Sequence, residues 1–274
     1  MPDGIARADA IGEDDVTAFW RDGIVCLRGL IDGQTVEALR AEIERELAAP
    51  GPLELDLTRG MNGRFFGNTF VCHHRPGFRS FVEDGPGAAL AARFLRSTTS
   101  TLLFDQLLIK EPGTETPTPW HHDLPYWPVA GDQVCTLWIA LDPVTKESGA
   151  VEYVKGSHRW GQHYAPIAFV RDGLYRTDLP ALPDVAAERD RHDFACYELA
   201  PGDATLHHAL TIHGAPGNAR RDRRRRAYIQ RWCGDDVRWA PRPGIQPMLR
   251  DPGLVPGDAL PCELFPRIWP RRER

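Results

Sequence analysis

Two histidines and one aspartate form the most informative pattern in this sequence. His121 and Asp123 lie close together in the segment 120–123, and His213 lies much later in the chain, directly before a glycine. Two imidazoles and one carboxylate can bind one face of an octahedral Fe(II) ion and leave three positions open, an arrangement typical of non-haem iron oxygenases. Open positions on a redox metal allow chemistry, whereas a closed site only holds structure.

Strand geometry predicts how the first histidine and the aspartate share one ion. Side chains at positions i and i+2 of an extended strand point to the same side, so both can face a metal while His122 points away. His122 is the main competing ligand, because it is one residue out of register. His207 and His208 are alternatives to His213, but they lie in a strand-like run, where core or supporting roles are more common.

The surrounding sequence strengthens this interpretation. A turn rich in proline and threonine (114–119) precedes the first pair, and an aromatic stretch (124–128) follows it. A run of arginines (220–226) follows the second histidine and leads into another strand-like segment. We expect most of these arginines on a solvated loop. One cation near the metal would suit an anionic co-substrate.

Three segments resemble the phytanoyl-CoA dioxygenase family. The stretch 120–128 (WHHDLPYWP) is similar to the iron-binding segment of that family, 148–159 (SGAVEYVKGSHR) to its Gly-Ser-His stretch, and 201–227 to its C-terminal segment. The resemblance covers roughly residues 13–235, and the segments occur in the order of the family. It implies a double-stranded β-helix fold and the use of Fe(II), 2-oxoglutarate and O2.

The resemblance also implies an anchor for 2-oxoglutarate. The far carboxylate of this co-substrate needs a buried cation, and an arginine fork can bind it through two parallel hydrogen bonds. The Arg-x-Ala pattern of the family assigns this role to Arg225. Arg224 and Arg226 remain alternatives, because the preceding loop is one residue longer than usual in the family. Thr136 and Trp127 are further candidates for binding the co-substrate.

Candidate substrate residues come from two parts of the chain. Tyr126 closely follows the first two ligands and either packs in the core or forms a wall of the substrate site. Arg64, Phe65 and Phe66 lie in the N-terminal half, from which the substrate pockets of the family often draw residues. We expect a small-molecule substrate. Family members act on quite different substrates, so the fold and the cofactors transfer better than the substrate does.

Length and composition limit the possible classes of protein. A chain of 274 residues suits a single domain, 1–274, in which 236–274 forms a C-terminal surface extension. The net charge of −5 gives no general attraction to nucleic acid. No apolar run reaches the ~18 residues that span a membrane. The acidic segment 1–15 has no apolar signal-peptide core, which predicts a cytoplasmic location without a membrane partner.

The periodicity predicts mainly β structure with flanking helices. Apolar residues at helical spacing predict a helix over 34–48, and both faces of the strand predicted at 133–141 are mainly apolar, which indicates a sheet covered on both sides. Short strands separated by turns favour a double-stranded β-helix, a jelly-roll or cupin-like fold. The long polar segment 171–193 is expected to form a lid or an insertion. Further helices are predicted over 14–22 and 86–97, and further strands over 24–27, 102–111, 150–154, 195–199, 204–208 and 227–232.

These observations together predict an Fe(II)- and 2-oxoglutarate-dependent dioxygenase that hydroxylates a small molecule, with succinate and CO2 as co-products. Two other classes of protein are alternatives. One is a cupin-type metalloenzyme that does not use 2-oxoglutarate, and the other is a non-catalytic ligand-binding barrel. Dependence of turnover on 2-oxoglutarate distinguishes the predicted dioxygenase from a cupin-type metalloenzyme.

Overall fold

The larger of two facing β-sheets forms the frame of the protein. The structure is a computed structural model that describes residues 5–6, 11–167 and 177–271. The nine strands of this sheet run in the order β1-β2-β11-β8-β13-β5-β4-β3, with β15 paired to β5, and all neighbours are antiparallel except β1 and β2. Its strands are β1 (Ile5–Ala6), β2 (Ile24–Arg28), β3 (Glu54–Asp56), β4 (Phe65–Thr69), β5 (Ser100–Lys110), β8 (Val134–Ala140), β11 (Ala204–His208), β13 (Arg225–Cys233) and β15 (Arg267–Trp269).

The smaller sheet has four short strands in the order β10-β9-β12-β6. These are β6 (Thr118–His121), β9 (Glu152–Val154), β10 (Phe194–Cys196) and β12 (His213–Ala215). A further pair joins β7 (Val129–Ala130) to β14 (Arg238–Trp239). In the described residues the sheets do not merge into one closed barrel, and the architecture is the predicted jelly-roll.

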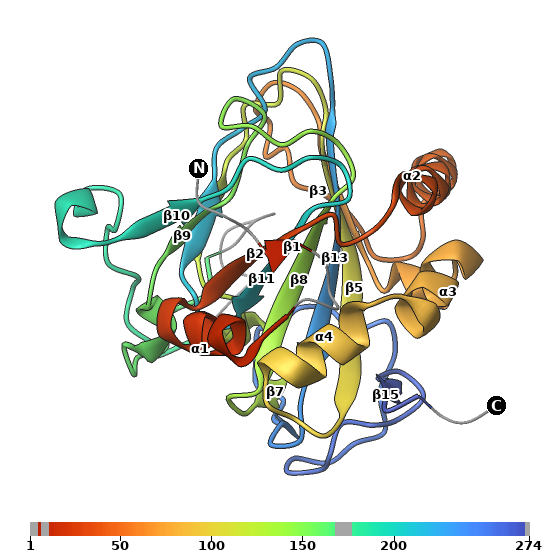
Figure 1. Cartoon of the computed structure of the whole chain (residues 1–274), viewed down its shortest axis with the longest axis vertical. Coiled ribbons are helices and arrows are strands. Elements are labelled where there is room, and N and C mark those ends of the chain that lie inside the picture. Colours follow the sequence, from red (N-terminus) through yellow and green to blue (C-terminus); the bar gives the residue numbers. More distant parts are fainter. Residues whose placement is uncertain (1–4, 7–10, 168–176, 272–274) are drawn as a thin grey trace.

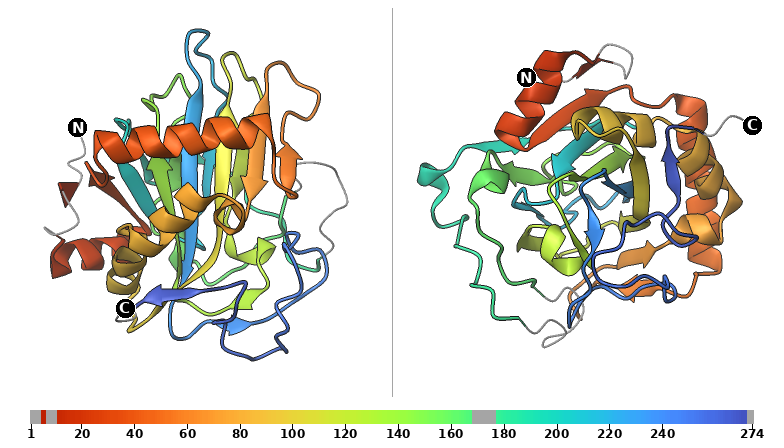
Figure 2. Two further views of the ribbon diagram at one scale, coloured as in Figure 1. Left: turned by 90° about the vertical axis from the view of Figure 1, so that its right-hand side faces the viewer. Right: turned by 90° about the horizontal axis from the view of Figure 1, so that it is seen from below.

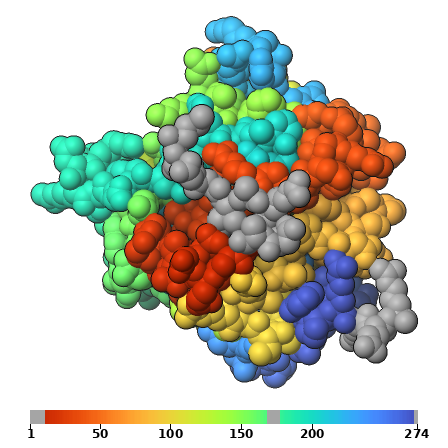
Figure 3. Space-filling model, viewed as in Figure 1, coloured from red at the N-terminus to blue at the C-terminus, as the bar shows by residue number. Residues whose placement is uncertain are grey.

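Four α-helices cover the outer face of the larger sheet, away from β9 and β10 (Figure 1; Figure 2, left). They are α1 (Glu13–Asp22), α2 (Gly33–Ala48), α3 (Pro76–Asp84) and α4 (Gly87–Phe94). The space-filling view shows side chains of these N-terminal elements over much of that face (Figure 3). Short 3-10 helices occur at η2 (Val71–His73), η3 (Leu124–Tyr126), η4 (Ser157–Arg159) and η5 (Arg189–Arg191).

Alternation along the strands separates a helix-facing core from a sheet-facing core. On β8, Leu137 and Ile139 pack with the helices, whereas Trp138 and Ala140 pack on the opposite side toward the smaller sheet. On β13, Ala227 and Ile229 belong to that second side. The sequence predicts this two-sided burial for 133–141, and the structure confirms it. The strand predicted at 204–208 is also present with the same bounds.

Other elements differ from the prediction. The helix predicted over 86–97 ends at Phe94, and the strand predicted over 195–199 covers Phe194–Cys196. The sequence does not predict several elements, among them α3 and β4. All five residues of β4 are buried, so its sequence lacks the alternation that reveals a half-buried strand.

The C-terminal segment is more than the surface extension that the sequence predicts. Val237, Trp239, Leu260 and Phe265 are buried in one apolar cluster with η3 and β5 residues, because the segment covers one end of the larger sheet. Part of the predicted lid, 168–176, lies outside the described residues. The rest of it, from 177 on, contributes Val185 to a small core beneath the smaller sheet.

No helix in the described part of the chain is both long and apolar enough to cross a membrane. All six cysteines are free thiols in the structure.

Candidate metal centre

The two candidate histidine ligands lie on adjacent strands of the smaller sheet. His121 ends β6, His213 begins β12, and the two residues are direct partners in the antiparallel pairing. Direct pairing brings the two imidazole rings together, with centroids 4.2 Å apart. The register of two short strands therefore sets the distance between two candidate metal ligands.

Asp123 completes the group from a turn rather than from a strand. Strand β6 ends at His121, and Asp123 has helical backbone angles (φ −75°, ψ −43°) as the N-cap of η3. The strand alternation in the prediction is therefore wrong in detail. The turn is held by the backbone N–H groups of Asp123 and Leu124, which both donate to the carbonyl of Ala209 at 2.8 and 3.0 Å.

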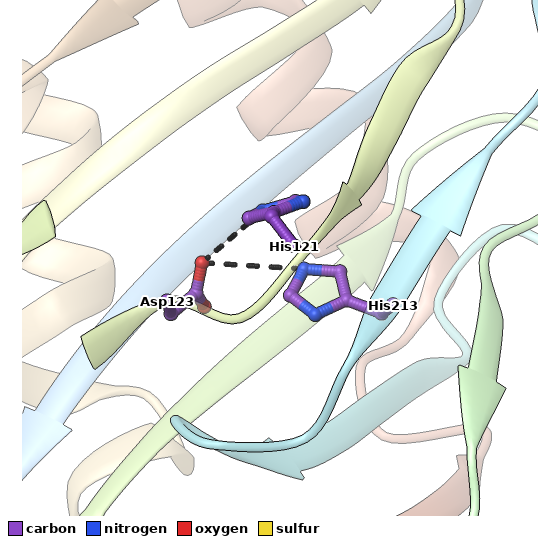
Figure 4. Close-up of side chains that lie close together, drawn as sticks. All are labelled: His121, Asp123 and His213. Carbon is purple, nitrogen blue, oxygen red and sulfur yellow. Dashed lines mark ion pairs between the residues drawn. The ribbon is translucent and has the colours of Figure 1, made fainter. Parts of the chain in front are cut away.

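The three ligand atoms converge (Figure 4). Asp123 Oδ1 lies 3.5 Å from His121 Nε2 and 4.0 Å from His213 Nε2, and the donor atoms all lie within 4.8 Å of one another. His122 points away, as predicted, and its Nε2 accepts a hydrogen bond from the backbone N–H of Tyr164 at 2.9 Å. His208 also lies apart, bonded to the carbonyl of Asp132.

Backbone carbonyls orient both imidazoles toward the centre. His121 Nδ1 lies 2.8 Å from the carbonyl of Pro119, and His213 Nδ1 lies 2.9 Å from that of Thr211. A proton on each Nδ1 makes Nε2 the basic nitrogen, which is the atom that faces the other ligands. Burial, with the neighbouring imidazoles, lowers the pKa of His213 well below its ordinary value, so the ring is neutral at neutral pH.

Two groups from the larger sheet hold the carboxylate. Thr136 Oγ1 on β8 donates to Asp123 Oδ2 at 2.8 Å, and His207 Nε2 on β11 lies 3.3 Å from the same oxygen. Burial alone would raise the pKa of Asp123, but the hydrogen bonds of His121 and His207 hold it well below its ordinary value. The carboxylate is thus ionised, with one oxygen anchored and the other aimed at the imidazoles, and the set fits an Fe(II) ion.

The triad lines a cavity of about 320 Å³ between the two sheets. Most of its wall is apolar, and the polar groups beyond the triad and its two supporting residues are few. The wall also includes Phe65, Gln106, Tyr126, Trp127, Trp138, Arg225, Arg231 and Gln246.

Arg225 is the arginine of the run that enters this cavity. It is only 2% exposed, its guanidinium carbon lies 5.4 Å from the Trp138 ring centroid, and its Nε has no hydrogen-bond partner among the described residues. Its neighbours on the strand point outward: Arg224 pairs with Glu44 and Glu111, and Arg226 pairs with Asp142 and Glu44. The predicted register is therefore the one that the structure has.

Two predicted roles need correction or relocation. The sequence predicts Thr136 as a donor to the co-substrate, but its hydroxyl donates to Asp123 instead. Trp127 lines the cavity, but it packs edge-on against Phe104 and near Arg231, not beside Arg225.

Two of the four predicted substrate residues line the cavity and two do not. Phe65 and Tyr126 line the cavity. Phe66 faces the opposite side and packs in the helix-facing core, and Arg64 is half exposed, 3.9 Å from Glu54. Alternation on β4 thus excludes Phe66 from the cavity wall, and Arg64 does not line it either.

Sequence reasoning missed two buried cations. Lys110, Arg225's partner on β5, is fully buried, donates to the carbonyl of Pro216 at 2.6 Å, and has its pKa lowered well below the ordinary value by burial and then by Arg225. Arg231 lies on the same face of β13 as Arg225. A signal existed for Arg231, because residues at even spacing from Arg225 share its side of the strand.

Comparisons with known proteins agree with this geometry. The sequence model of the phytanoyl-CoA dioxygenase family matches residues 19–227. "Multifunctional dioxygenase prhA" of Penicillium brasilianum is 26% identical over 237 residues, which cover 80% of this chain and 71% of that protein.

Solved structures support the same assignment. The non-haem alpha-ketoglutarate-dependent carbocyclase SnoK from nogalamycin biosynthesis has a TM-score of 0.78 and 26% identity, with 97% of this chain and 100% of that chain covered. The epimerase SnoN in complex with Fe3+, alpha-ketoglutarate and nogalamycin RO has a TM-score of 0.74 and 25% identity, with 93% and 98% covered. This chain therefore belongs to the phytanoyl-CoA dioxygenase family, and it is an iron- and 2-oxoglutarate-dependent oxygenase.

Proposed function

We propose that the protein hydroxylates a C–H bond of a small, largely apolar molecule bound between the two sheets. One observation carries the proposal: the triad and a buried, incompletely bonded arginine line the same mainly apolar cavity. A metal centre alone would be compatible with many metalloenzymes. The additional buried cation favours an acidic co-substrate that binds within reach of the metal.

His121, Asp123 and His213 would hold Fe(II) and leave three positions for exogenous ligands. When bound, iron with 2-oxoglutarate and O2 supplies the oxidising power needed to break an unactivated C–H bond, with succinate and CO2 as co-products. Thr136 and His207 keep the carboxylate ligand in one orientation. The apolar wall keeps bulk water away from the reacting atoms and presents the substrate's C–H bond to the metal.

Arg225 is the proposed anchor of the far carboxylate of 2-oxoglutarate. Burial lowers its pKa to about 10, so the guanidinium remains charged at neutral pH. Lys110 lies next to it, but burial lowers the pKa of that ammonium and its Nζ already donates to Pro216. Arg225 is therefore the stronger candidate of the two for an ion pair with a carboxylate.

Two measurements test this proposal together. Under anaerobic conditions, Fe(II) and 2-oxoglutarate should bind with a stoichiometry of one each and produce a weak visible charge-transfer band. With O2 and a library of candidate metabolites, the protein should convert 2-oxoglutarate to succinate. A protein that binds iron but shows neither the band nor succinate would instead support a cupin-type metalloenzyme, and a protein that binds no metal would support a ligand-binding barrel.

Two other reactions are tested by measuring the mass of the product, because SnoK is a carbocyclase and SnoN an epimerase. Product mass distinguishes the three reactions. Hydroxylation adds one oxygen atom to the substrate and ring closure removes two hydrogen atoms. Epimerisation leaves the mass unchanged and requires an added two-electron reductant, such as ascorbate, because the substrate then supplies no electrons. Cell fractionation would test the accompanying prediction of a cytoplasmic location.

A further inference from the structure

A second buried arginine, Arg231, lines the same cavity, and two of its guanidinium nitrogens have no hydrogen-bond partner among the described residues. Arg231 follows Arg225 on β13 and faces the same side of the strand. It is 7% exposed, and its Nη2 donates to Gln106 Oε1 at 2.6 Å. Its Nε and Nη1 are buried and have no hydrogen-bond partner in the part of the chain that the structure describes.

No carboxylate of the described residues forms an ion pair with this guanidinium. Two buried carboxylates, Asp123 and Asp105, attract this guanidinium electrostatically, but neither is hydrogen-bonded to it. Asp123 is bonded to Thr136 and His207 through one oxygen and faces the imidazoles with the other. Asp105 accepts from the Tyr228 hydroxyl and the Cys72 N–H. Arg231 lies instead over two aromatic rings, 4.7 Å from the Phe104 centroid and 5.7 Å from that of Trp127. A buried cation without an anion is costly, so a bound anion or acceptor in the cavity would remove a large penalty.

The contacts of the two arginines place them at different parts of the cavity. Arg225 lies beside Trp138, and its cross-strand neighbour on β5 is Lys110. The cross-strand neighbour of Arg231 on β8 is Thr136, and its guanidinium packs against Phe104 and Trp127. An extended strand rises about 3.3 Å per residue, so roughly 20 Å of strand separates their Cα atoms. A co-substrate anchored at Arg225 therefore leaves Arg231 available for another ligand.

A second donor lines the cavity beside the turn that contains Tyr126 and Trp127. Gln246 belongs to the C-terminal segment, and its backbone N–H donates to the carbonyl of Tyr126, next to Trp127, at 2.9 Å. Its Nε2 is buried with no hydrogen-bond partner among the described residues. Two sets of unused N–H donors beside aromatic side chains can bind an anionic oxygen attached to an aromatic ring.

We propose that Arg231, assisted by Gln246, recognises an anionic oxygen on an aromatic substrate, either a carboxylate or a phenolate. The inference rests on the proposed function, in which substrate and co-substrate share this cavity. The cation would hold the polar end of the substrate near Trp127. The apolar wall would hold the remainder, so one part of the substrate is fixed while another faces the metal.

Matched acids and amides test the proposal without the natural substrate. Protein loaded with Fe(II) and 2-oxoglutarate under anaerobic conditions, so that the metal and Arg225 are occupied, is titrated with benzoate and benzamide, and with 2-naphthoate and 2-naphthamide. A phenol arm uses 4-nitrophenol under mildly alkaline conditions, where it is ionised and both arginines stay charged, with 4-nitroanisole as its neutral counterpart. We expect at least one acid or phenolate to bind about tenfold or more tightly than the neutral amide, as a charge-assisted hydrogen bond predicts.

Variants assign the preference to one side chain. Arg231→Gln should weaken binding of the preferred anion roughly ten- to hundredfold and change binding of the amide by less than about threefold. Arg226→Gln is the matched control on the same strand, because Arg226 pairs with Asp142 outside the cavity, and it should leave anion binding unchanged. Gln246→Leu changes a residue outside the sheets and should weaken anion binding about three- to tenfold. It tests the same proposal if Arg231→Gln does not fold.

Three results would overturn the inference. These are equal binding of acids, phenolate and amides by the wild-type protein, unchanged anion binding in Arg231→Gln, and a large loss of 2-oxoglutarate binding in Arg231→Gln. The last result would assign Arg231 to the co-substrate. Failure of the proposed function is seen separately, as absence of succinate, and it leaves the comparison of acids with amides intact.

Discussion

The two sheets of this protein contribute different kinds of chemistry to one cavity. The smaller sheet supplies two imidazoles, His121 and His213, from strands of four and three residues. The larger sheet supplies charge and orientation: Arg225 and Arg231 as cations, and Thr136 as a donor to the carboxylate ligand. The metal ligands therefore depend on the register of two short strands, whereas the cations depend on the alternation of one long strand.

Support from the rest of the fold also differs between the sheets. The larger sheet is backed by four helices and a large apolar core, which holds its cavity face in position. The smaller sheet has only a small core, and its ligands are oriented by local carbonyls at Pro119 and Thr211. Asp123 lies in a turn between them and is bonded from the larger sheet. Variants at these positions can test whether the two contributions are separable.

The largest effect is expected from Asp123→Ala, because Asp123 links the two sheets and is the anionic ligand. Loss of a ligand should weaken Fe(II) binding by more than about 100-fold, beyond the usual effect of removing a supporting residue. Succinate formation should fall to background. Calorimetry with Fe(II) under anaerobic conditions measures the first effect. Wild-type-like iron affinity in this variant would mean that the triad is not the metal site.

Arg225→Gln should show that the contributions of the two sheets are separable. Removing a buried charged partner commonly costs about 2–5 kcal/mol, which corresponds to roughly 30- to 5000-fold weaker binding of 2-oxoglutarate. Iron binding should remain, since the ligands belong to the other sheet and the turn. Arg226→Gln is the control, because this side chain pairs with Asp142 and Glu44. A larger effect in Arg226→Gln than in Arg225→Gln would contradict the assignment.

Thr136→Val tests whether the larger sheet also tunes the metal. The hydroxyl of Thr136 holds Asp123 Oδ2, and loss of such a supporting hydrogen bond typically weakens metal binding by about 10- to 100-fold. Thr116→Val is the control, because the buried Thr116 hydroxyl donates to the carbonyl of Thr58 and not to the triad. Equal iron affinities in the two variants would show that Thr136 does not orient the ligand.

The smallest effect on activity is expected from Asp105→Asn, on the helix-facing side of the larger sheet, because this change concerns stability alone. Burial raises the pKa of Asp105 from 3.8 to about 6, against the opposing effect of the Tyr228 hydroxyl. The folded protein therefore binds this proton more tightly than the unfolded chain, and stability is lost as the pH rises from about 4 to about 6.

Because asparagine cannot ionise, the variant should be more stable than the wild type by about 3 kcal/mol above this range and nearly equal below it. Urea unfolding of both proteins on either side of the range measures the difference. A constant difference across the range would contradict ionisation of Asp105 as the cause. Oxygenase activity should be unchanged, since Asp105 does not line the cavity.

The sequence alone indicated the candidate metal ligands, which the structure brings together, and the main strands. His121, Asp123 and His213 occur in segments with a specific local pattern. The strand predicted at 204–208 has the same bounds in β11, and the strand predicted at 133–141, with both faces apolar, is β8 (134–140). Arg225 was predicted from the Arg-x-Ala pattern of the resembling family, and alternation then requires Arg224 and Arg226 to face the other way. The alternation of side chains along a strand follows from backbone geometry, so the order of residues in the sequence is enough to predict which side chains share a face.

Only the tertiary structure decided the remaining features. The position of Asp123 in a turn depends on the carbonyl of Ala209, and the partner of Thr136 depends on that turn. The burial of Arg231 depends on the rings of Phe104 and Trp127, and Gln246 reaches the cavity wall because the C-terminal segment returns to this part of the fold. Whether a polar side chain is solvated or buried without a partner is set by contacts between segments far apart in the chain, and no local period records such contacts.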